Sequence, residues 1–275
     1  MMHSRASRSP IGTLLRDWRA KRRLSQLDLA SEAEISQRHL SFVESGRARP
    51  SRDMVLRLAE MLNVPLRERN RMLHAAGFAP VFGERPLDDP ALLPAMEAVR
   101  AVLKGHEPFP SLAVDRHWNV IATNGALAPF FALVAEPALL QPSANVYRLA
   151  LHPGGLAPHI VNFAEWRSHL LHRLRAQNDS VADPVLIALE QEITAYPAPA
   201  TSRSGPTSAS HSTIAVPLKL KLGGEVLSFL STVTVFGTPL DVTLAELAVE
   251  SLFPADDRTG ELLRIIAAQR GEPDS

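Results

Sequence analysis

Four side chains between residues 36 and 46 have the sizes and chemistry that read base edges in DNA. They share one face of a short predicted helix and are Gln37, Arg38, Ser41 and Phe42. Amide, guanidinium and hydroxyl groups form hydrogen bonds with base edges, and an apolar ring packs on the thymine methyl group. We therefore predict that these residues contact bases in the major groove, as the second helix of a helix-turn-helix does.

A second set of polar residues flanks this helix and could bind DNA phosphates. These residues are Arg22, Ser25, Gln26, Arg47, Arg49 and Arg52. Contacts with phosphate fix the register of a protein on the duplex without reading its sequence. The alternative is a solvated cationic rim, which any helical domain can carry. Arg47 and Arg49 directly follow the helix, which favours the phosphate role; the alternative stays open for the outer face of residues 11–23.

Two short helices joined by a tight turn are predicted to position these side chains. The first helix has apolar residues at Leu27, Leu29, Ala30 and Ala33, and the turn follows at Glu34 and Ile35. Ser36 is a suitable N-cap of the second helix, because its hydroxyl can accept a hydrogen bond from a free backbone amide. The second helix buries Leu40 and Val43 and ends at Gly46. Further helices are expected over 11–23, 51–62 and 65–77, which makes an all-α domain of five helices.

This stretch resembles the Xre family of helix-turn-helix domains, the phage-repressor type, over about 65 residues. The matching positions are Gln26, Leu29-Ala30, Ile35-Ser36, Leu40-Ser41, Glu44-x-Gly46, Pro50-Ser51 and Leu56-x-x-Ala59-x-x-Leu62. Many spaced matches in one ordered stretch are more specific than a single short motif. The alternative is a five-helix bundle that binds another protein. Exposed Gln37, Arg38 and Arg47 argue against it, since the core of a bundle needs none of them.

Charge is distributed unevenly along the 275 residues, although the formal net charge is zero. Residues 1–80 contain 15 Lys and Arg against 8 Asp and Glu, and residues 81–275 contain 14 against 21. A phosphate-binding surface is therefore expected on the N-terminal part alone. The chain has no cysteine, and we find no apolar run of transmembrane length and no signal peptide. These features predict a cytoplasmic protein, and the composition suggests a bacterial one.

The second part of the chain reads as an α+β domain. A helix is expected over 91–103, followed by a hairpin of strands 111–114 and 118–123, with Asn124 capping the next helix. Helical spacing continues over 163–175, and Asp183 caps a helix that runs to about residue 194. Two β-rich runs, 213–222 and 225–236, flank Gly223-Gly224, which predicts a hairpin. Helices over 243–252 and near the C-terminus complete the prediction.

The segment VDRHWNVIATNGALAPFF resembles the start of a PAS sensor domain. Together with the Xre-type domain and AAGFAP, the architecture is similar to the MmyB-like regulators, in which a PAS-related domain follows the Xre domain. The resemblance implies a multidomain, ligand-responsive bacterial transcription regulator, with a fatty-acid-like acyl compound as the leading ligand class and an antiparallel sheet in the second domain. The expected parts are a flexible arm (1–10), the helix-turn-helix domain (11–79), a linker and connecting helix (80–105), the PAS-like domain (106–255) and a C-terminal helix and tail (256–275).

Arg148 and His152 are candidates for holding the carboxylate or lactone of such a ligand, because an arginine fork matches a carboxylate. The apolar part of the ligand would lie among Phe130, Phe131, Leu149, Val161, Trp166 and Leu170. The alternative is that Arg148 pairs with an acid of the domain such as Glu165, and that the aromatic residues form ordinary core.

Other kinds of site are not favoured. Glu165, His169 and His172 share a helix face but lie beside a solvent-facing run of Arg167, Arg173 and Arg175, so we predict a polar helix flank and no metal site. No nucleophile, phosphate-loop or dinucleotide motif is present, which makes an enzyme the weaker class. An enzyme or interaction scaffold with a DNA tether stays the alternative function. Because one such helix reads about half a site, a homodimer on double-stranded DNA is expected, with no membrane partner.

Overall fold

The structure is a computed structural model that describes residues 10–181, 183–199, 215–237 and 239–271. It divides into two compact units. Unit 1 comprises residues 1–89 and 237–245, and unit 2 comprises residues 90–236 and 246–275. Most of the predicted arm, the first two residues of the predicted strand 213–222 and the last residues of the tail lie outside the described residues.

Unit 1 contains the five predicted helices. They are α1 (Pro10–Lys21), α2 (Gln26–Glu32), α3 (Gln37–Ser45), α4 (Arg52–Met61) and α5 (Leu66–Ala75). Serine hydroxyls cap three N-termini: Ser25 accepts from the amide of Asp28, Ser36 from that of His39, and Ser51 from that of Met54. Each cap supplies a partner to an amide that the helix leaves free, which is why these short helices begin where they do.

The core of unit 1 follows the predicted pattern with one exception. Leu40 and Val43 of α3 are fully buried. Leu29 of α2 and Ala33, the C-cap of that helix, are fully buried as well. Leu27 is 60% exposed, so its assignment to the apolar face of the first helix is wrong. Residues 27 and 29 lie about 200° apart around a helix, and only one of them can face the same core.

Glycine has a specific role at two positions in this unit. Gly46 ends α3 in the left-handed conformation at φ 78°, which residues with a Cβ adopt rarely. A Cβ at Gly12 would lie 2.5 Å from the carbonyl oxygen of Glu44. Gly12 therefore allows α1 to approach the C-terminal end of α3 and so fixes the position of the helix that was predicted to read DNA.

Unit 2 is built on one five-stranded antiparallel sheet in the order β2-β1-β5-β4-β3. The strands are β1 (Ser111–Val114), β2 (Val120–Thr123), β3 (Leu218–Leu222), β4 (Glu225–Val235) and β5 (Ala248–Pro254). The predicted hairpin around Gly223 and Gly224 is confirmed, and both glycines have positive φ. The last strand in the sequence lies at the centre of the sheet, where it pairs with β1 and β4.

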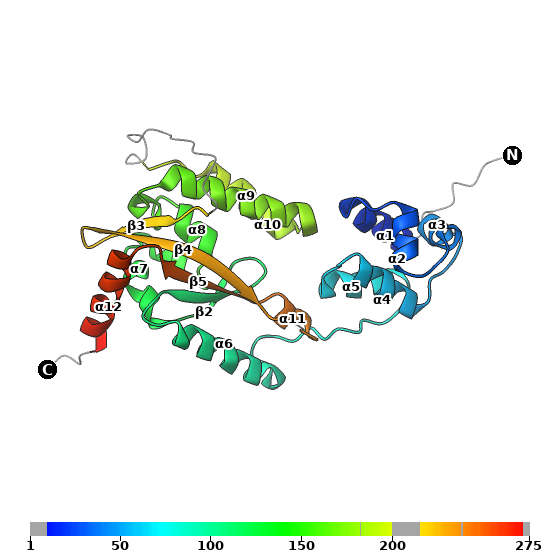
Figure 1. Ribbon diagram of the computed structural model, residues 1–275, viewed down its shortest axis with the longest axis horizontal. Helices are drawn as coiled ribbons and strands as arrows, with labels where there is room; N and C mark the ends of the chain where they lie inside the picture. The colour runs from blue at the N-terminus through cyan, green and yellow to red at the C-terminus, as the bar shows by residue number, and fades with distance from the viewer. Residues whose placement is uncertain (1–9, 182, 200–214, 238, 272–275) are drawn as a thin grey trace. The chain divides into compact units, whose positions relative to one another are not determined.

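Helices cover both faces of this sheet, as Figure 1 shows for unit 2. A 3-10 turn (Pro90–Leu92) leads into α6 (Leu93–Gly105), which packs on β1 and β2 from one face. The other face is covered by α7 (Ala128–Phe131), α8 (Val146–Leu151), α9 (Phe163–Val181) and α10 (Pro184–Ala195). The short α11 (Val242–Ala245) joins β4 to β5, and α12 (Asp257–Gly271) packs against both strands.

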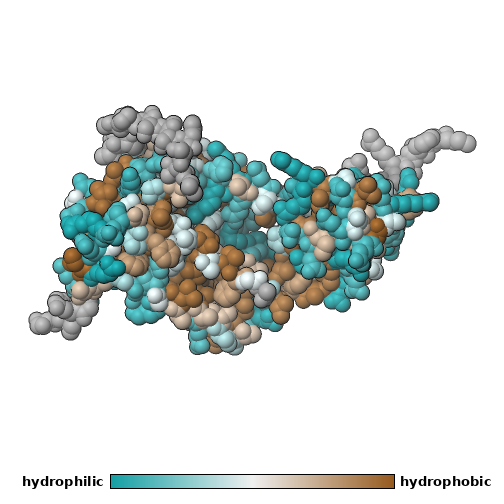
Figure 2. Space-filling model, viewed as in Figure 1, coloured by the Kyte–Doolittle hydropathy of each residue, from teal (hydrophilic) through white to brown (hydrophobic). Residues whose placement is uncertain are grey.

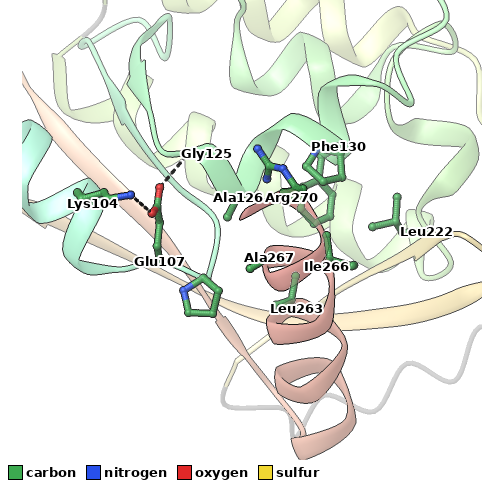
Figure 3. Close-up of a pocket in the computed structure, with 12 residues that line it drawn as sticks. Lys104, Glu107, Gly125, Ala126, Phe130, Leu222, Leu263, Ile266, Ala267 and Arg270 are labelled. Atoms are coloured by element: carbon green, nitrogen blue, oxygen red, sulfur yellow. Dashed lines mark hydrogen bonds and ion pairs between the residues drawn. The ribbon is translucent and has the colours of Figure 1, made fainter. Parts of the chain in front are cut away.

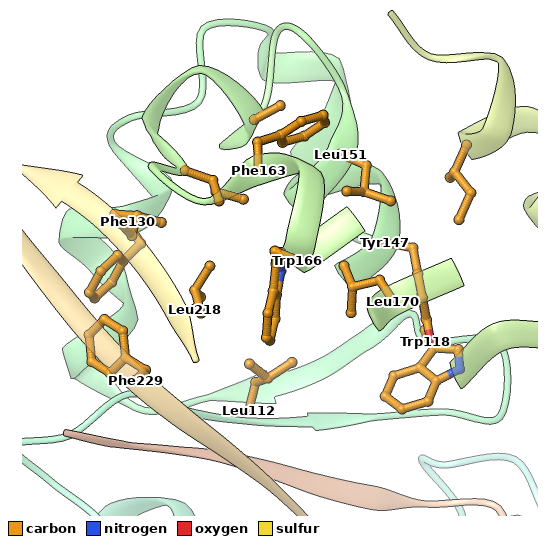
Figure 4. Packing of buried hydrophobic residues seen from close by; sticks show 14 of the residues in the cluster. Leu112, Trp118, Phe130, Tyr147, Leu151, Phe163, Trp166, Leu170, Leu218 and Phe229 are labelled. Atoms are coloured by element: carbon orange, nitrogen blue, oxygen red, sulfur yellow. The ribbon is translucent and has the colours of Figure 1, made fainter. Parts of the chain in front are cut away.

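The main core of unit 2 lies between the sheet and the helices α7 to α10. Figure 4 shows Trp166 between Leu218 and Leu170, with Leu112 of β1 beneath it, and Trp118 next to Tyr147. Trp118 and Tyr147 meet edge to face at 5.2 Å between ring centroids. The predicted helical spacing of Phe163, Trp166, Leu170 and Leu174 is confirmed, since all four are buried.

Two predictions about the secondary structure of unit 2 are wrong. The segment 243–252 is not one helix, because α11 ends at Ala245 and β5 begins at Ala248. The strand sequence AVESLFP does not alternate strictly between apolar and polar residues, so periodicity alone does not distinguish it from a helix. Asn124 does not cap the following helix with its side chain. Instead, Oδ1 of its side chain accepts a hydrogen bond from the backbone N–H of Ser111, and Nδ2 donates to the backbone carbonyls of Leu103 and Phe109.

Candidate functional site

The exposed face of α3 brings the four predicted base-contacting residues together. Gln37 and Arg38 are exposed, and Ser41 and Phe42 are half-buried. The guanidinium of Arg38 lies 5.3 Å from the ring centroid of Phe42, and that of Arg47 lies 5.9 Å from it. Cation–π attraction from both arginines restrains the ring. The face thus presents an amide, a hydroxyl, an aromatic ring and two cations within one helix and the loop that follows it.

A buried carboxylate anchors α3 from behind. Glu44 is 1% exposed, and its oxygens accept from Arg19 Nε at 2.7 Å and from Gln26 Nε2 at 2.8 Å. Burial would raise the pKa of Glu44, but hydrogen bonds from Arg19 and Gln26 and the charge of Arg16 outweigh burial and lower it. The carboxylate is therefore ionised, and it links α1, α2 and α3 in one network.

The predicted phosphate contacts are not equally placed. Arg47, Arg49 and Arg52 are exposed around the end of α3 and the start of α4. Arg22 instead donates to the carbonyls of Leu62 and Asn63 at 2.8 and 3.0 Å, so its guanidinium satisfies the C-terminal end of α4.

At the start of α2, Ser25 forms a capping box with Asp28, in which each side chain accepts from the other residue's backbone amide. Gln26 gives its side-chain amide to Glu44. These two residues fix the N-terminus of α2 beside the exposed face.

Unit 2 contains an apolar cavity of about 80 Å³ between the sheet and its helices. Strands β1, β2, β3 and β5 and helices α7, α8 and α9 all contribute to its walls. Five of the predicted ligand-contacting residues line it, namely Phe130, Phe131, Leu149, Trp166 and Leu170. The structure therefore gathers most of the predicted apolar set around one cavity.

Arg173 and Glu250 form the charged part of the cavity wall. Arg173 Nη1 donates to Glu250 Oε1 at 3.1 Å and Arg173 Nε donates to the hydroxyl of Tyr147 at 3.1 Å. The guanidinium also lies 4.2 Å from the ring centroid of Trp118. Burial would lower the pKa of Arg173, but Glu250 and Tyr147 outweigh burial and raise it.

Three polar atoms of the cavity residues are buried without a hydrogen-bond partner among the described residues. They are Arg173 Nη2, Glu250 Oε2 and Trp166 Nε1. Buried polar atoms without partners are rare and unfavourable, and they call for a specific explanation. A molecule bound in the cavity could supply an acceptor to the two donors and a donor to the carboxylate.

Arg148, His152 and Val161 do not line this cavity. Arg148 forms a bidentate pair with Glu192 at 2.8 and 2.7 Å and lowers the pKa of that carboxyl. It thus pairs with an acid of its own domain, as the alternative interpretation held, although the acid is Glu192 and not Glu165. His152 lies 3.6 Å from Glu136, and Val161 is 54% exposed.

The prediction that Arg173 faces solvent is wrong. The sequence also gives no indication that Glu250 contributes to a ligand site. Arg173 follows Trp166 and Leu170 by seven and three residues, so the helical stripe that identified those two also includes position 173. Glu250 was assigned to a helix, and only its true position on β5 opposite Leu112 brings it to the cavity.

A separate surface groove of about 280 Å³ lies beside α12. Figure 3 shows Arg270 and Lys104 at its edges and Leu263 and Ile266 along α12, with Glu107 accepting from Lys104 and from the amide of Gly125. Phe130 lines both the groove and the inner cavity. Its side chain thus separates the cavity from the surface.

Two family models match the chain. One is described as the MmyB-like transcription regulator ligand binding domain and matches residues 95–265; the other is described as a helix-turn-helix and matches residues 15–69. Both are families of regulator domains and not of enzymes. No curated protein matches the chain.

Solved structures give further likenesses. The clp gene regulator ClgR from Corynebacterium glutamicum is 24% identical, over 36% of this chain and 93% of that chain, with a TM-score of 0.23. The PAS domain of Bordetella pertussis BvgS is 15% identical, over 64% of this chain and 97% of that chain, with a TM-score of 0.26. An RNA-binding light-oxygen-voltage receptor is 13% identical, over 96% of this chain and 65% of that chain, with a TM-score of 0.28.

Proposed function

Because the chain belongs to the MmyB-like transcription regulators, we propose that it is a sequence-specific regulator whose DNA binding is controlled by a small acyl or similarly apolar ligand. It is a DNA-binding transcription regulator with a ligand-binding domain. The finer proposal concerns which residues read DNA, what the ligand is and how many copies act together. The observation that supports it most is an apolar cavity whose wall carries polar atoms that have no hydrogen-bond partner within the described part of the chain.

For DNA, we propose that Gln37, Arg38, Ser41 and Phe42 contact bases and that Arg47, Arg49 and Arg52 contact phosphates. The exposed arginines around α3 support the phosphate role, since cations at that position meet the duplex backbone. Ser25 and Gln26 would add phosphate contacts from the start of α2, beside the exposed face of α3. Such a regulator acts where the DNA is, in the cytoplasm of a bacterial cell. Within the described residues no helix is long and apolar enough to span a membrane.

Arg38→Ala is expected to weaken binding to the operator by about 1–3 kcal/mol and to relax one base preference. Arg49→Ala serves as the matched comparison, because it should weaken binding to all sequences equally and reduce the salt slope by about 1. Fluorescence anisotropy with operator and scrambled duplexes at several salt concentrations measures both effects. An unchanged ratio of operator to scrambled affinity in Arg38→Ala would remove its base-reading role.

For the ligand, the polar atoms of the cavity favour an uncharged head group. Glu250 already neutralises Arg173, so an ionised carboxylate placed there would be a second negative charge beside a single cation. A head group with one acceptor and one donor would satisfy Arg173 Nη2 and Glu250 Oε2 together. Trp166 lies seven residues earlier on α9, about 10 Å along the helix axis, and offers a second donor. A hydroxylated acyl chain has this chemistry, because a hydroxyl group both donates and accepts.

The cavity is smaller than most ligand sites, which occupy about 300–1,000 Å³. A chain of about twelve methylenes gains roughly 10 kcal/mol gross on burial at ~0.8 per group, against association costs of about 4 kcal/mol or more. Because a chain of this length is larger than the cavity, the cavity walls must move apart to admit it, at the expense of part of this gain. Ligand binding would therefore change the spacing between the sheet and its helices, which a sensor requires.

Native mass spectrometry of the purified protein, followed by organic extraction, is expected to reveal a bound acyl compound. After extraction, dodecan-1-ol at about 100 times its dissociation constant should raise the free energy of unfolding by about 2.7 kcal/mol. Ala150→Leu narrows the cavity and should abolish this gain, whereas the surface variant Ala138→Leu should retain it. A protein that emerges empty and gains no stability from dodecan-1-ol, dodecanoate or a butyrolactone would contradict the ligand proposal and leave the DNA-binding proposal standing.

We also propose that the protein binds DNA as a homodimer. One recognition helix covers about half a site, so two copies are needed with centres about 34 Å apart. Unit 2 offers exposed apolar side chains for the interface, including Leu93 and Val102 of α6 and Val235 at the end of β4. Figure 2 shows apolar side chains on the surface of unit 2 over this region. The other candidate function, an enzyme with a DNA tether, has no supporting observation in either matched family.

A further inference from the structure

The connection between β4 and β5 leaves its own sheet. Neighbouring antiparallel strands can be joined by a two-residue hairpin, whereas here residues 236–247 lie between the two strands. Residues 237–245 belong to unit 1, although both strands that they join belong to unit 2. The connection is therefore longer than the pairing of the two strands requires.

This segment is packed against the linker that follows the DNA-binding helices. The amide of Val242 donates to the carbonyl of Gly83 at 2.7 Å, and Arg85 Nη1 donates to Asp241 Oδ2 at 2.7 Å. The hydroxyl of Thr243 donates to the carbonyl of Arg85 at 2.6 Å. Asp241 is 5% exposed and Val242 is 1% exposed. A Cβ at Gly83 would lie 3.0 Å from the carboxylate oxygen Asp241 Oδ2, so glycine at this position leaves room for the Asp241 side chain.

The linker side of this contact is attached to α5. The side chain of Asn70 accepts from the amides of Val81 and Phe82 and donates to the carbonyl of Phe82. Arg67 pairs with Glu84, and α11 itself packs against α5. A displacement of residues 241–245 must therefore act on the last helix of the DNA-binding unit.

The other end of the segment leads directly to the cavity. Glu246 pairs with Arg116, which also pairs with Asp183 at the N-terminus of α10. Four residues further on, β5 carries Glu250, the acidic part of the cavity wall. Residues 241 and 250 are nine positions apart in one chain. A shift of β5 that accompanies a change in the cavity is thus transmitted through the backbone to Asp241.

We propose that residues 241–245 and 81–85 form a clasp that transmits the state of the cavity to the DNA-binding unit. This proposal rests on the proposed function, in which a ligand separates the cavity walls. The structure has a narrow cavity and a closed clasp. A larger occupant displaces β5 and weakens the contacts of Asp241 and Val242 with Arg85 and Gly83. A ligand that prefers the displaced arrangement then shifts the population of the open clasp.

Hydrogen exchange of the full-length protein, followed by mass spectrometry, tests the clasp with and without a ligand. Filling the cavity by Ala150→Leu, or by the milder Val146→Leu if the first variant does not fold, replaces the ligand in one arm. Dodecan-1-ol added to the wild type is the other arm. Either change is expected to speed exchange in peptides covering 81–85 and 241–245 by about tenfold, because local opening sets the exchange rate.

Asp241→Asn supplies the matched control, since it weakens the contact with Arg85 far from the cavity lining. In this variant, exchange at 81–85 should already be fast and should no longer respond to Ala150→Leu, whereas peptides covering 166–174 should still respond. Suppose that, without the Asp241→Asn change, Ala150→Leu and dodecan-1-ol alter hydrogen exchange at 166–174 and leave it unchanged at 81–85. This result would overturn the clasp and leave the ligand proposal intact. A response of 81–85 to Ala150→Leu, with none anywhere to dodecan-1-ol, would support the clasp and reject the ligand class.

Discussion

Glu44→Gln is expected to destabilise the DNA-binding unit by about 3–5 kcal/mol, because it leaves the guanidinium of Arg19 largely buried without a charged partner. Glu44 is 1% exposed and accepts hydrogen bonds from Arg19 and Gln26. Hydrogen exchange in α1 and α3 measures the loss directly, with rates rising by about a hundredfold or more at 1.4 kcal/mol per factor of ten. Affinity for DNA should fall with it, because Glu44 fixes α3 against α1 and α2.

Glu60→Gln is the matched control for this variant, since Glu60 is exposed on α4 and should change stability little. The pH dependence gives a second test. The pKa of Glu44 in the folded protein is lower than its ordinary value of 4.5. Its contribution is thus fully present above 4.5 and is lost as the pH falls through the lower, folded-state pKa. In Glu44→Gln, the free energy of unfolding should depend less on pH in this range. If it falls equally in both proteins as the pH is lowered, a group other than Glu44 causes the acid destabilisation.

Arg173→Met is expected to have a similar effect on the ligand-binding unit, about 3–5 kcal/mol, because it leaves Glu250 buried and unpaired. Glu250 is 3% exposed, and Arg173 is also its link to Tyr147. Urea unfolding followed by the fluorescence of Trp118 and Trp166, both buried in this unit, would report the loss.

The double variant Arg173→Met with Glu250→Leu should recover stability to within about 1 kcal/mol of wild type, since apolar residues often replace a buried ion pair without loss. It should nevertheless lose any preference between dodecan-1-ol and its methyl ether, because the partners of the head group are gone. If the two single variants and the double variant are all equally unstable, the pair is not coupled as the structure indicates.

The helices of unit 1 could be predicted because their signals are local. Ser36 and Gly46 mark the ends of α3, and Leu40 and Val43 identify its buried face within nine residues. The same spacing places Glu44 beside Leu40 on that face. The spacing alone therefore indicates that Glu44 is buried. It does not indicate the partner of Glu44, because Arg19 lies 25 residues away on another helix.

Unit 2 was predicted less completely because its decisive contacts are remote in sequence. The hairpin at Gly223 and Gly224 is a local signal and was confirmed. The central position of β5 depends on pairing with β1, about 140 residues earlier, and the local pattern of a strand without strict alternation does not distinguish it from a helix.

The cavity shows the same division between local and remote signals. Trp166 and Leu170 were identified from helical spacing, whereas the partner of Arg173 lies 77 residues away. The contact between Asp241 and Arg85 spans 156 residues, and nothing in the sequence of either segment indicated it.

The central claim is that this chain is a sequence-specific DNA-binding regulator that reads its site with α3. Incubating the full-length protein with sheared genomic DNA of its host and sequencing the bound fragments tests this most directly. The account predicts enrichment of fragments upstream of genes that share a near-palindrome with half-site centres about 34 Å apart, and loss of that enrichment in Arg38→Ala. Bound fragments that sample the genome at random, or a shared sequence that Arg38→Ala still selects, would contradict it.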